Sequence, residues 1–96
     1  MHLAALCVAV ALGIYLDISI PEWCLIVFAI GFVIAAELFN TALERWCDEA
    51  SGGKQSPLIR NAKDVSSGAV LFSALTALVI GILLLIVPFI QRIMTL

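Results

Sequence analysis

Apolar residues form three long stretches along the chain, and the turn-forming and charged residues gather in two shorter segments between them. The first stretch closes at Asp17 and Pro21, and the second keeps a helical pattern beyond its last purely apolar residue, Ala36. The second and third stretches reach the roughly 20 residues that a helix needs to cross a bilayer. The pattern predicts an all-α membrane protein with one domain over residues 1–96. The predicted spans are about residues 3–18, 22–48 and 65–90, with a loop over about 49–64.

The amino-acid composition also favours a protein that lies in lipid rather than in water. Of its 96 residues 64% are hydrophobic and 12% charged, and the mean hydropathy is +1.18. A soluble domain of this size could not hide so much apolar surface, because small domains keep much of their surface in water. The basic residues are too few for a nucleic-acid partner. The three cysteines are widely spaced, which supports neither a zinc site nor a disulfide framework. They are Cys7, Cys24 and Cys47.

The basic residues also predict how the chain lies in the membrane. Four of the five lie between the second and third stretches, at Arg45, Lys54, Arg60 and Lys63. The positive-inside rule therefore places this connection and the N-terminus in the cytoplasm, with the C-terminus on the far side. A cleaved signal peptide is the competing interpretation of the first stretch, but no Lys or Arg precedes it and no clear cleavage site follows it.

A polar face interrupts the end of the second stretch. At about 100° per residue, one face of this helix carries Glu37, Asn40, Thr41, Glu44 and Asp48. Glu37 lies roughly 12 Å deeper than Arg45, and an intramembrane acid points to function because its burial costs on the order of 2–3 kcal/mol or more. Interhelical hydrogen bonding is the alternative for Glu37 and Asn40. Asp48 and Glu49 also suit an ordinary solvated helix end.

The spacing of Glu37 and Glu44, about 10 Å along one helix face, suits two separate roles. The deeper acid can act as a general base, and the shallower one can hold a hard cation such as Mg²⁺. Lys63 and Asp64 stand where the third span enters the membrane. A lysine suits a phosphate group and an aspartate suits a ribose, an amine or a metal. Alternatively, Lys63 anchors the span at the surface and Asp64 favours a helix N-terminus.

Two further patterns are weaker. Gly52-Gly53-Lys54 lacks the first glycine and the preceding strand of a phosphate loop, so that match is rejected. Small residues recur at four-residue spacing, which favours close helix packing in lipid and a homo-oligomer. These ladders are Ala5, Ala9 and Gly13, then Gly31 and Ala35, then Ala69, Ser73, Ala77 and Gly81.

Two motifs together resemble the prokaryotic diacylglycerol kinase and undecaprenol kinase family. The first is Glu37-Leu-Phe-Asn40-Thr-Ala-Leu-Glu44 followed by Asp48, and the second is Ala62-Lys63-Asp64-Val-Ser-Ser-Gly68-Ala69-Val-Leu. The resemblance covers roughly residues 15–81. It implies a homotrimer of three-helix subunits in the bacterial cytoplasmic membrane. Such a kinase transfers the γ-phosphoryl group of ATP to a lipid hydroxyl with Mg²⁺, at sites between subunits near the cytoplasmic face.

The resemblance also implies roles for individual residues. Glu37 would be the catalytic base, Glu44 would bind the metal and the nucleotide phosphates, and Asn40 would support them. Nucleotide contacts would also come from Lys63, Asp64, Gln55 and Ser56, although many family members have a histidine where Ser56 stands. The lipid-contacting positions would be Glu37, Ser67 and the run Tyr15, Leu16, Asp17 and Ile18.

One departure from the family pattern bears on activity. The family usually begins with a basic amphipathic helix and a further metal-binding glutamate, and His2-Leu3-Ala4-Ala5 matches the residues just after that segment. We therefore expect these 96 residues alone to have low activity. The alternatives to a lipid kinase are a non-catalytic or truncated membrane oligomer on the same scaffold, and a small ion or proton channel lined by Glu37 and Asn40. A channel would leave Lys63 and Asp64 without a role.

Overall fold

The protein is a long bundle of helices. A computed structural model describes the backbone of residues 2–96 and the side chains of residues 3–96, and no strand occurs among them. The helices are α1 (His2–Leu16), α2 (Ile20–Ser51), α3 (Pro57–Gly81), the π-helical segment η1 (Ile82–Ile86) and α4 (Val87–Met94). The all-helical prediction is therefore confirmed.

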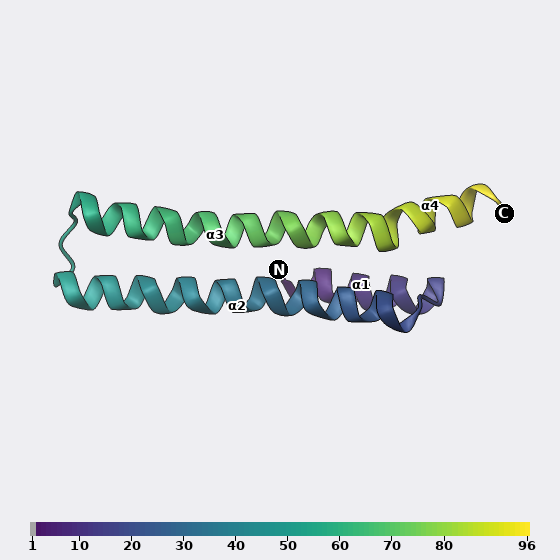
Figure 1. Cartoon of the computed structure of the whole chain (residues 1–96), viewed down its shortest axis with the longest axis horizontal. Coiled ribbons are helices and arrows are strands. Elements are labelled where there is room, and N and C mark those ends of the chain that lie inside the picture. Colours follow the sequence, from purple (N-terminus) through teal and green to yellow (C-terminus); the bar gives the residue numbers. More distant parts are fainter. Residues whose placement is uncertain (1) are drawn as a thin grey trace.

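The helices are arranged as a hairpin with a shorter helix beside it. α2 and α3 run antiparallel and pack along their length, and α1 folds back along the N-terminal half of α2 (Figure 1). α1 also contacts η1 and α4, so three helices meet at that end. The bundle measures 60 × 21 × 19 Å. The C-terminal half of α2 lies beyond α1 and packs against α3 (Figure 1).

Local sequence signals set the limits of α2. The Ser19 hydroxyl accepts a hydrogen bond from the Glu22 backbone N–H at 3.4 Å, and Glu22 Oε1 accepts one from the Ser19 N–H at 3.0 Å. This capping box and Pro21 in the first turn fix the start of the helix. Gly52 ends it in the left-handed region, at φ 62°, where glycine has no steric penalty.

The connection between α2 and α3 is shorter than the predicted stretch of about residues 49–64. Only residues 52–56 lie outside the two helices. Ser56 caps α3, because its hydroxyl accepts a hydrogen bond from the Ile59 N–H at 3.2 Å and Pro57 occupies the first turn. Residues 57–64, which include three charged side chains, therefore form the first two turns of α3, which the apolar pattern alone did not predict. At the other end, α1 stops at Leu16, so Asp17 (φ 53°) and Ile18 lie in the turn.

A wider helical turn carries the third helix through to its end. In η1 the Val87 N–H bonds to the Ile82 carbonyl, five residues back. Pro88 follows immediately, and a proline lacks an N–H and crowds the preceding turn. The π-helical segment accommodates this proline without ending the helix, so residues Pro57–Met94 form one continuous rod of 38 residues.

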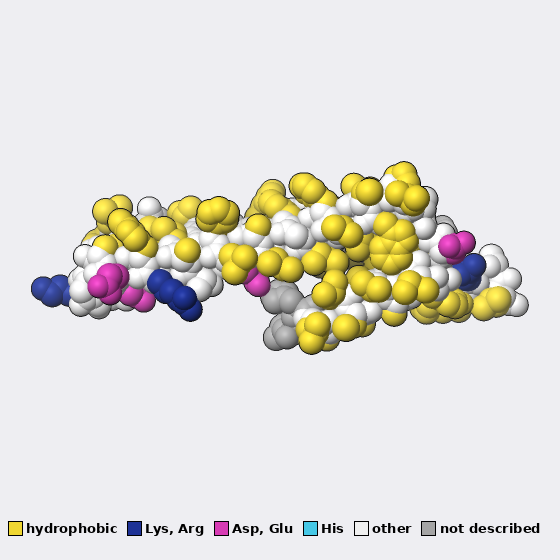
Figure 2. Space-filling view, turned by 90° about the horizontal axis from the view of Figure 1, so that it is seen from below, with side chains coloured by type: hydrophobic (Ala, Val, Ile, Leu, Met, Phe, Trp, Pro, Cys, Tyr) yellow, Lys and Arg dark blue, Asp and Glu magenta, His cyan; other side chains and the backbone are white. Residues whose placement is uncertain are grey.

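Two helices are long and apolar enough to cross a membrane, by length and composition: Ile20–Ser51 and Pro57–Met94. The apolar helix Leu3–Leu16 is shorter than the roughly 20 residues of a full span. Few side chains are buried inside the chain, and its surface is covered by apolar groups (Figure 2). Such a surface is typical of a protein that lies in lipid. The buried apolar side chains are Ile26, Ala29, Val33, Cys47 and Leu85.

Two contacts hold α1 in place. Gly13 lies against Trp23, and a Cβ built on Gly13 would meet the Cη2 atom of the indole at 2.5 Å. At the end of α1, the Arg92 guanidinium donates to the Tyr15 carbonyl at 2.6 Å and lies 5.1 Å from the centroid of the Tyr15 ring. Phe89 also packs edge-on against that ring. Of the predicted small-residue ladders, Gly13 and Ser73 lie at helix contacts, whereas Gly31 and Ala35 are exposed in the single chain.

Gly13→Ala should loosen this contact, because the added methyl group has no room beside the indole ring. We expect a loss of stability of about 1–3 kcal/mol, as for other overpacked sites, seen as a lower thermal midpoint in detergent. Gly81→Ala is the matched control, since nothing lies within 4 Å of a Cβ at Gly81. An equal change in both variants would contradict the assigned role of Gly13.

Candidate active site

The predicted polar face of α2 lies on the seam between α2 and α3. The buried residues Val33 and Cys47 are joined by half-buried positions at intervals of three and four residues, and these are Glu37, Asn40 and Glu44. Because this half of α2 packs against α3, the polar groups lie along the helix contact rather than toward open lipid. The facing positions of α3 include Lys63, Ser66 and Ser73, the last only 1% exposed.

Asn40 has an unused acceptor in this seam. Its Oδ1 atom is buried and accepts no hydrogen bond from any described residue. A buried oxygen of this kind normally has a donor or a cation beside it, because an unsatisfied buried polar group costs free energy. The side chain is therefore suited to an external partner, and Glu44, one turn further along the same face, places a carboxylate beside it.

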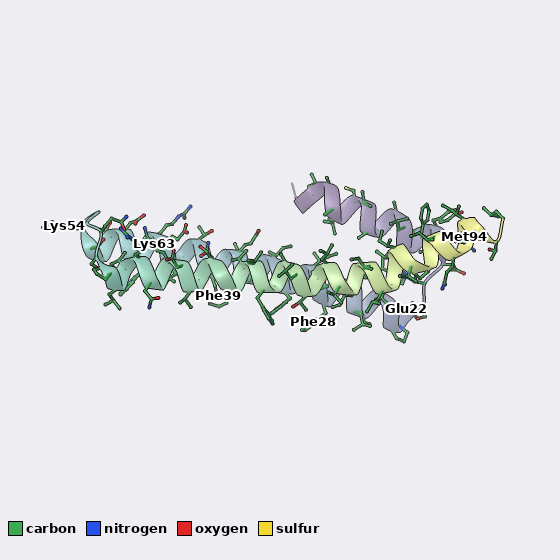
Figure 3. All side chains as sticks on the ribbon, turned by 90° about the horizontal axis from the view of Figure 1, so that it is seen from above. Glu22, Phe28, Phe39, Lys54, Lys63 and Met94 are labelled. Atoms are coloured by element: carbon green, nitrogen blue, oxygen red, sulfur yellow. The ribbon has the colours of Figure 1, made fainter. Side chains whose placement is uncertain are left out.

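Lys63 is bound to Asp48 across the seam. Its Nζ atom lies 2.5 Å from Asp48 Oδ1, and Glu44 lies close enough to attract the same ammonium group. The Lys63 side chain is 24% exposed and that of Asp48 62%. The pair links α2 to α3 near the connection between them. Lys63 and Lys54 lie at this end of the hairpin, and Glu22 and Met94 lie at the opposite end (Figure 3).

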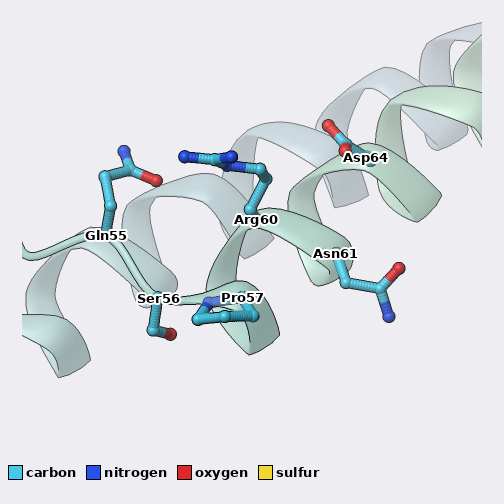
Figure 4. Close-up of a pocket in the computed structure, with 6 residues that line it drawn as sticks. All are labelled: Gln55, Ser56, Pro57, Arg60, Asn61 and Asp64. Atoms are coloured by element: carbon cyan, nitrogen blue, oxygen red, sulfur yellow. The ribbon is translucent and has the colours of Figure 1, made fainter.

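Lys63 and Asp64 are neighbours in sequence but face different surroundings. Lys63 bonds to α2, whereas Asp64 lines a groove of about 350 Å³ on the outer side of the hairpin. In Figure 4, Arg60 and Asp64 lie on one side of α3 with Gln55, and the guanidinium extends toward Gln55. The groove is lined by Gln55, Ser56, Pro57, Arg60, Asn61 and Asp64. The structure thus brings the predicted nucleotide residues to the same end, but on two faces.

The residues predicted to contact lipid are not gathered in one place. Ser67 is exposed on α3, one turn from Asp64. Tyr15, Leu16, Asp17 and Ile18 lie at the turn between α1 and α2, at the opposite end of the hairpin from Lys63 (Figure 1). Glu37 stands 17 residues along α2 from Ile20, or about 25 Å. A lipid that touches both Glu37 and this turn must therefore extend along α2.

The seam supplies oxygen ligands but no complete metal cage. Across the side chains of residues 3–96, no three His, Cys, Asp or Glu residues come together closely enough to hold a metal ion. Mg²⁺ does not require such a cage, because it is commonly held by one or two carboxylates together with substrate phosphates and water. Glu44 and the unsatisfied Asn40 oxygen fit that requirement.

The sequence did not identify Asp48 as the partner of Lys63. Asp48 fell on the polar face, but its position near the helix end was equally typical of a solvated acid. Only the antiparallel packing of α2 on α3 shows that it reaches Lys63. The sequence also assigned Arg60 and Asn61 no role in the site, although Arg60 and Asp64 share a helix face at four-residue spacing.

A comparison with protein families decides the relationship. The family model for prokaryotic diacylglycerol kinase matches residues 1–85. This chain belongs to the prokaryotic diacylglycerol kinase family. The resemblance carried by the Glu37–Glu44 and Ala62–Ala69 segments is thereby confirmed.

Two relatives illustrate the similarity. The undecaprenol kinase of Bacillus subtilis (strain 168) is 39% identical over 83 residues, which cover 86% of this chain and 67% of that protein. The diacylglycerol kinase of Synechocystis sp. is 43% identical over 56 residues, which cover 58% of this chain and 32% of that protein. No solved structure matches the chain at a significant level.

The ion pair of Asp48 and Lys63 should contribute little to stability, because it is partly exposed to water. We expect Asp48→Asn and Lys63→Gln each to lower the thermal midpoint slightly in low salt, and the double variant to lower it no further. At 1 M salt, where the Debye length is about 3 Å, these differences should disappear. A loss that persists in high salt would mean that Lys63 packs the seam instead.

Proposed function

We propose that this protein is an ATP-dependent lipid kinase of the bacterial cytoplasmic membrane, which transfers the γ-phosphoryl group of ATP to a lipid hydroxyl. The observation that carries the proposal is the polar seam of Glu37, Asn40 and Glu44 facing Lys63, in a chain of the prokaryotic diacylglycerol kinase family. The names of the two relatives suggest undecaprenol or diacylglycerol as the acceptor.

The order of groups along the seam suits the reaction. Glu37 lies about 10 Å deeper than Glu44 and about 16 Å deeper than Asp48, the partner of Lys63. A lipid hydroxyl beside Glu37 transfers its proton to that carboxylate while its oxygen attacks the γ-phosphorus. The bond from the γ-phosphorus to the bridging oxygen breaks, and ADP leaves. Lys63 attracts the phosphates, and Ser67 borders the path of the lipid.

Mg²⁺ would be held by Glu44 and the Asn40 oxygen. When bound, it neutralises negative charge on the phosphates. The chain's own residues supply the remaining needs of phosphoryl transfer, which are mainly positioning and a proton acceptor. The apolar residues around Glu37 exclude water, and this protects ATP from hydrolysis.

The membrane placement of the helices follows from their lengths and charges. α2 is about 48 Å long, well beyond the roughly 30 Å of hydrocarbon in a bilayer, so one end of the hairpin projects from it. We place that end, with residues 52–56, in the cytoplasm, because it carries most of the basic residues. α1 has no Asp, Glu, Lys or Arg and is proposed as the third span.

The proposed active form is a homotrimer. One chain leaves most of its large apolar side chains exposed, and its seam supplies few ligands for a metal or a nucleotide. Neighbouring subunits in contact with α2 and α3 would cover part of that surface and add groups to each site. Small residues that are exposed in one chain, such as Gly31 and Ala35, would allow close approach there.

The kinase proposal is tested by transfer of labelled γ-phosphate from Mg-ATP to diacylglycerol and to undecaprenol in mixed micelles. We expect slow transfer by the parent chain and a further loss of about 10²–10⁴-fold in kcat for Glu37→Gln, the range associated with removal of a general base. Glu49→Gln is the matched control, because Glu49 is exposed near the end of α2. Absence of transfer to both lipids, with nucleotide still bound, would favour a non-catalytic oligomer.

The orientation is tested with single cysteines in a background lacking Cys7, Cys24 and Cys47. A thiol reagent that does not cross membranes should label Asp17→Cys in spheroplasts, because the α1–α2 turn faces outward in the proposed topology. Lys54→Cys should react only after the membrane is opened. Labelling of Lys54→Cys in intact spheroplasts would contradict the cytoplasmic assignment of residues 52–56.

A further inference from the structure

The ammonium group of Lys63 already has an anionic partner in the single chain. Its Nζ atom lies 2.5 Å from Asp48 Oδ1, on the opposite helix of the hairpin. Carboxylate oxygens and phosphate oxygens both accept charge-assisted hydrogen bonds from an ammonium group. A phosphate chain that binds to Lys63 must therefore either share it with Asp48 or displace Asp48.

The positions of the acids along the seam favour displacement. Asp48 is eleven residues from Glu37, or about 16 Å along α2 toward the charged end of the hairpin. The γ-phosphoryl group must approach the lipid hydroxyl at Glu37, so a cation that accompanies it must lie deeper than Asp48. The flexible four-carbon stem of a lysine allows Lys63 to turn toward Glu44, which is about 6 Å deeper than Asp48. While Lys63 is bonded to Asp48, its charge stays at the outer end of the seam.

The charges around Lys63 lead to the same conclusion. Two carboxylates lie close to its ammonium group, that of Asp48 in direct contact and that of Glu44 near enough to attract it. A phosphate chain bound beside the intact pair would be repelled by the Asp48 carboxylate, because like charges a few ångströms apart repel. If Asp48 turns away, the phosphate chain meets the ammonium group directly.

Asp48 is the partner that can leave the pair easily. Its side chain is 62% exposed, whereas that of Lys63 is only 24% exposed. A carboxylate beside water regains its hydration when it leaves an ion pair, so a pair of this kind contributes little to stability. Lys63 is the less exposed member and remains in the seam, where a phosphate chain can take the place of Asp48.

From these observations, and resting on the proposed kinase function, we infer that Asp48 is an internal competitor of ATP, which binds Lys63 in the empty site and is displaced by the phosphate chain. Asp48 thereby weakens the binding of every phosphate ligand that needs Lys63, including the product ADP, and favours the release of ADP. A neutral ligand does not compete for Lys63 and is unaffected. Asp48 regulates occupancy of the site and takes no part in the chemical step.

The test is calorimetric binding of ATP, inorganic triphosphate and adenosine, each with Mg²⁺, to the purified full chain in detergent. Asp48→Asn keeps the size of the side chain and removes its charge. We expect this variant to bind ATP and triphosphate about two- to fivefold more tightly than the parent, the range that corresponds to loss of a partly exposed ion pair. Binding of adenosine should not change, because adenosine has no phosphate to place on Lys63.

Two further variants separate competition for Lys63 from general repulsion. Glu49→Gln removes an exposed carboxylate next to Asp48 in the sequence, and it should bind all three compounds as the parent does. Asp48→Glu keeps a carboxylate at the same position and should also bind as the parent does. Only the variant that removes the partner of Lys63 should then bind phosphate ligands more tightly.

Several outcomes would overturn the inference. Weaker binding of ATP by Asp48→Asn would mean that Asp48 holds Lys63 or the nucleotide in place. An equal gain in Glu49→Gln would reduce the effect to general charge. Unchanged binding by Asp48→Asn, or no binding of ATP by either the parent or Asp48→Asn, would also overturn it. Circular dichroism verifies that each variant is folded.

Kinetics keep this inference distinct from the kinase proposal. In the phosphate-transfer assay, Asp48→Asn should lower KM for ATP by the same factor as the dissociation constant, because the two are equal when the chemical step is slow. Transfer by the parent without tighter binding in Asp48→Asn contradicts only the role of Asp48. Tighter binding of ATP and triphosphate in Asp48→Asn, without transfer by either chain, supports the displacement of Asp48 and contradicts the kinase proposal.

Discussion

The contact between α2 and α3 is the interaction on which the rest of the molecule depends. In lipid, burial of apolar side chains does not drive two helices together, because the lipid tails are equally apolar. Close packing and polar contacts must do so instead. The two most buried side chains, Cys47 and Ser73, are both small and lie on this seam, and Ser73 satisfies its hydroxyl on the Val70 carbonyl of its own helix. Small side chains let the backbones approach.

Along the same seam, the residues that α2 contributes change from apolar to polar, and the polar ones form the candidate site. In the N-terminal half of α2 the buried positions are Ile26, Ala29 and Val33, and α1 lies alongside. Beyond the reach of α1 the same positions become Glu37, Asn40 and Glu44. These acids and amides lie on the half of the seam that is nearer the charged end of the hairpin, where Lys63 bonds to Asp48. The polar residues therefore form a continuous line from that end to Glu37.

Much of this could be predicted from the sequence, and the exceptions have physical reasons. The three apolar stretches predicted the all-helical architecture, and the helical period placed Glu37, Asn40 and Glu44 on one face. The early start of α3 was missed because Arg60, Lys63 and Asp64 lower the hydropathy of residues 57–64. The cap formed by Ser56 and Pro57 outweighs hydropathy in setting the start of the helix. The Asp48–Lys63 pair depends on how two helices register against each other, which the period of a single helix does not contain.

The Asp48–Lys63 pair also bears on how a polyanion can enter a site at the edge of the membrane. Lys63 and Asp48 form an ion pair with each other, and both side chains are partly exposed to water. The pair therefore opens at little cost in free energy. In the proposed complex, phosphate replaces Asp48 as the partner of Lys63, and Asp48, which is 62% exposed, returns to water. Lys63 then has a negatively charged partner both before and after the nucleotide binds. Because a phosphate chain carries more negative charge than one carboxylate, it competes well with Asp48 for Lys63.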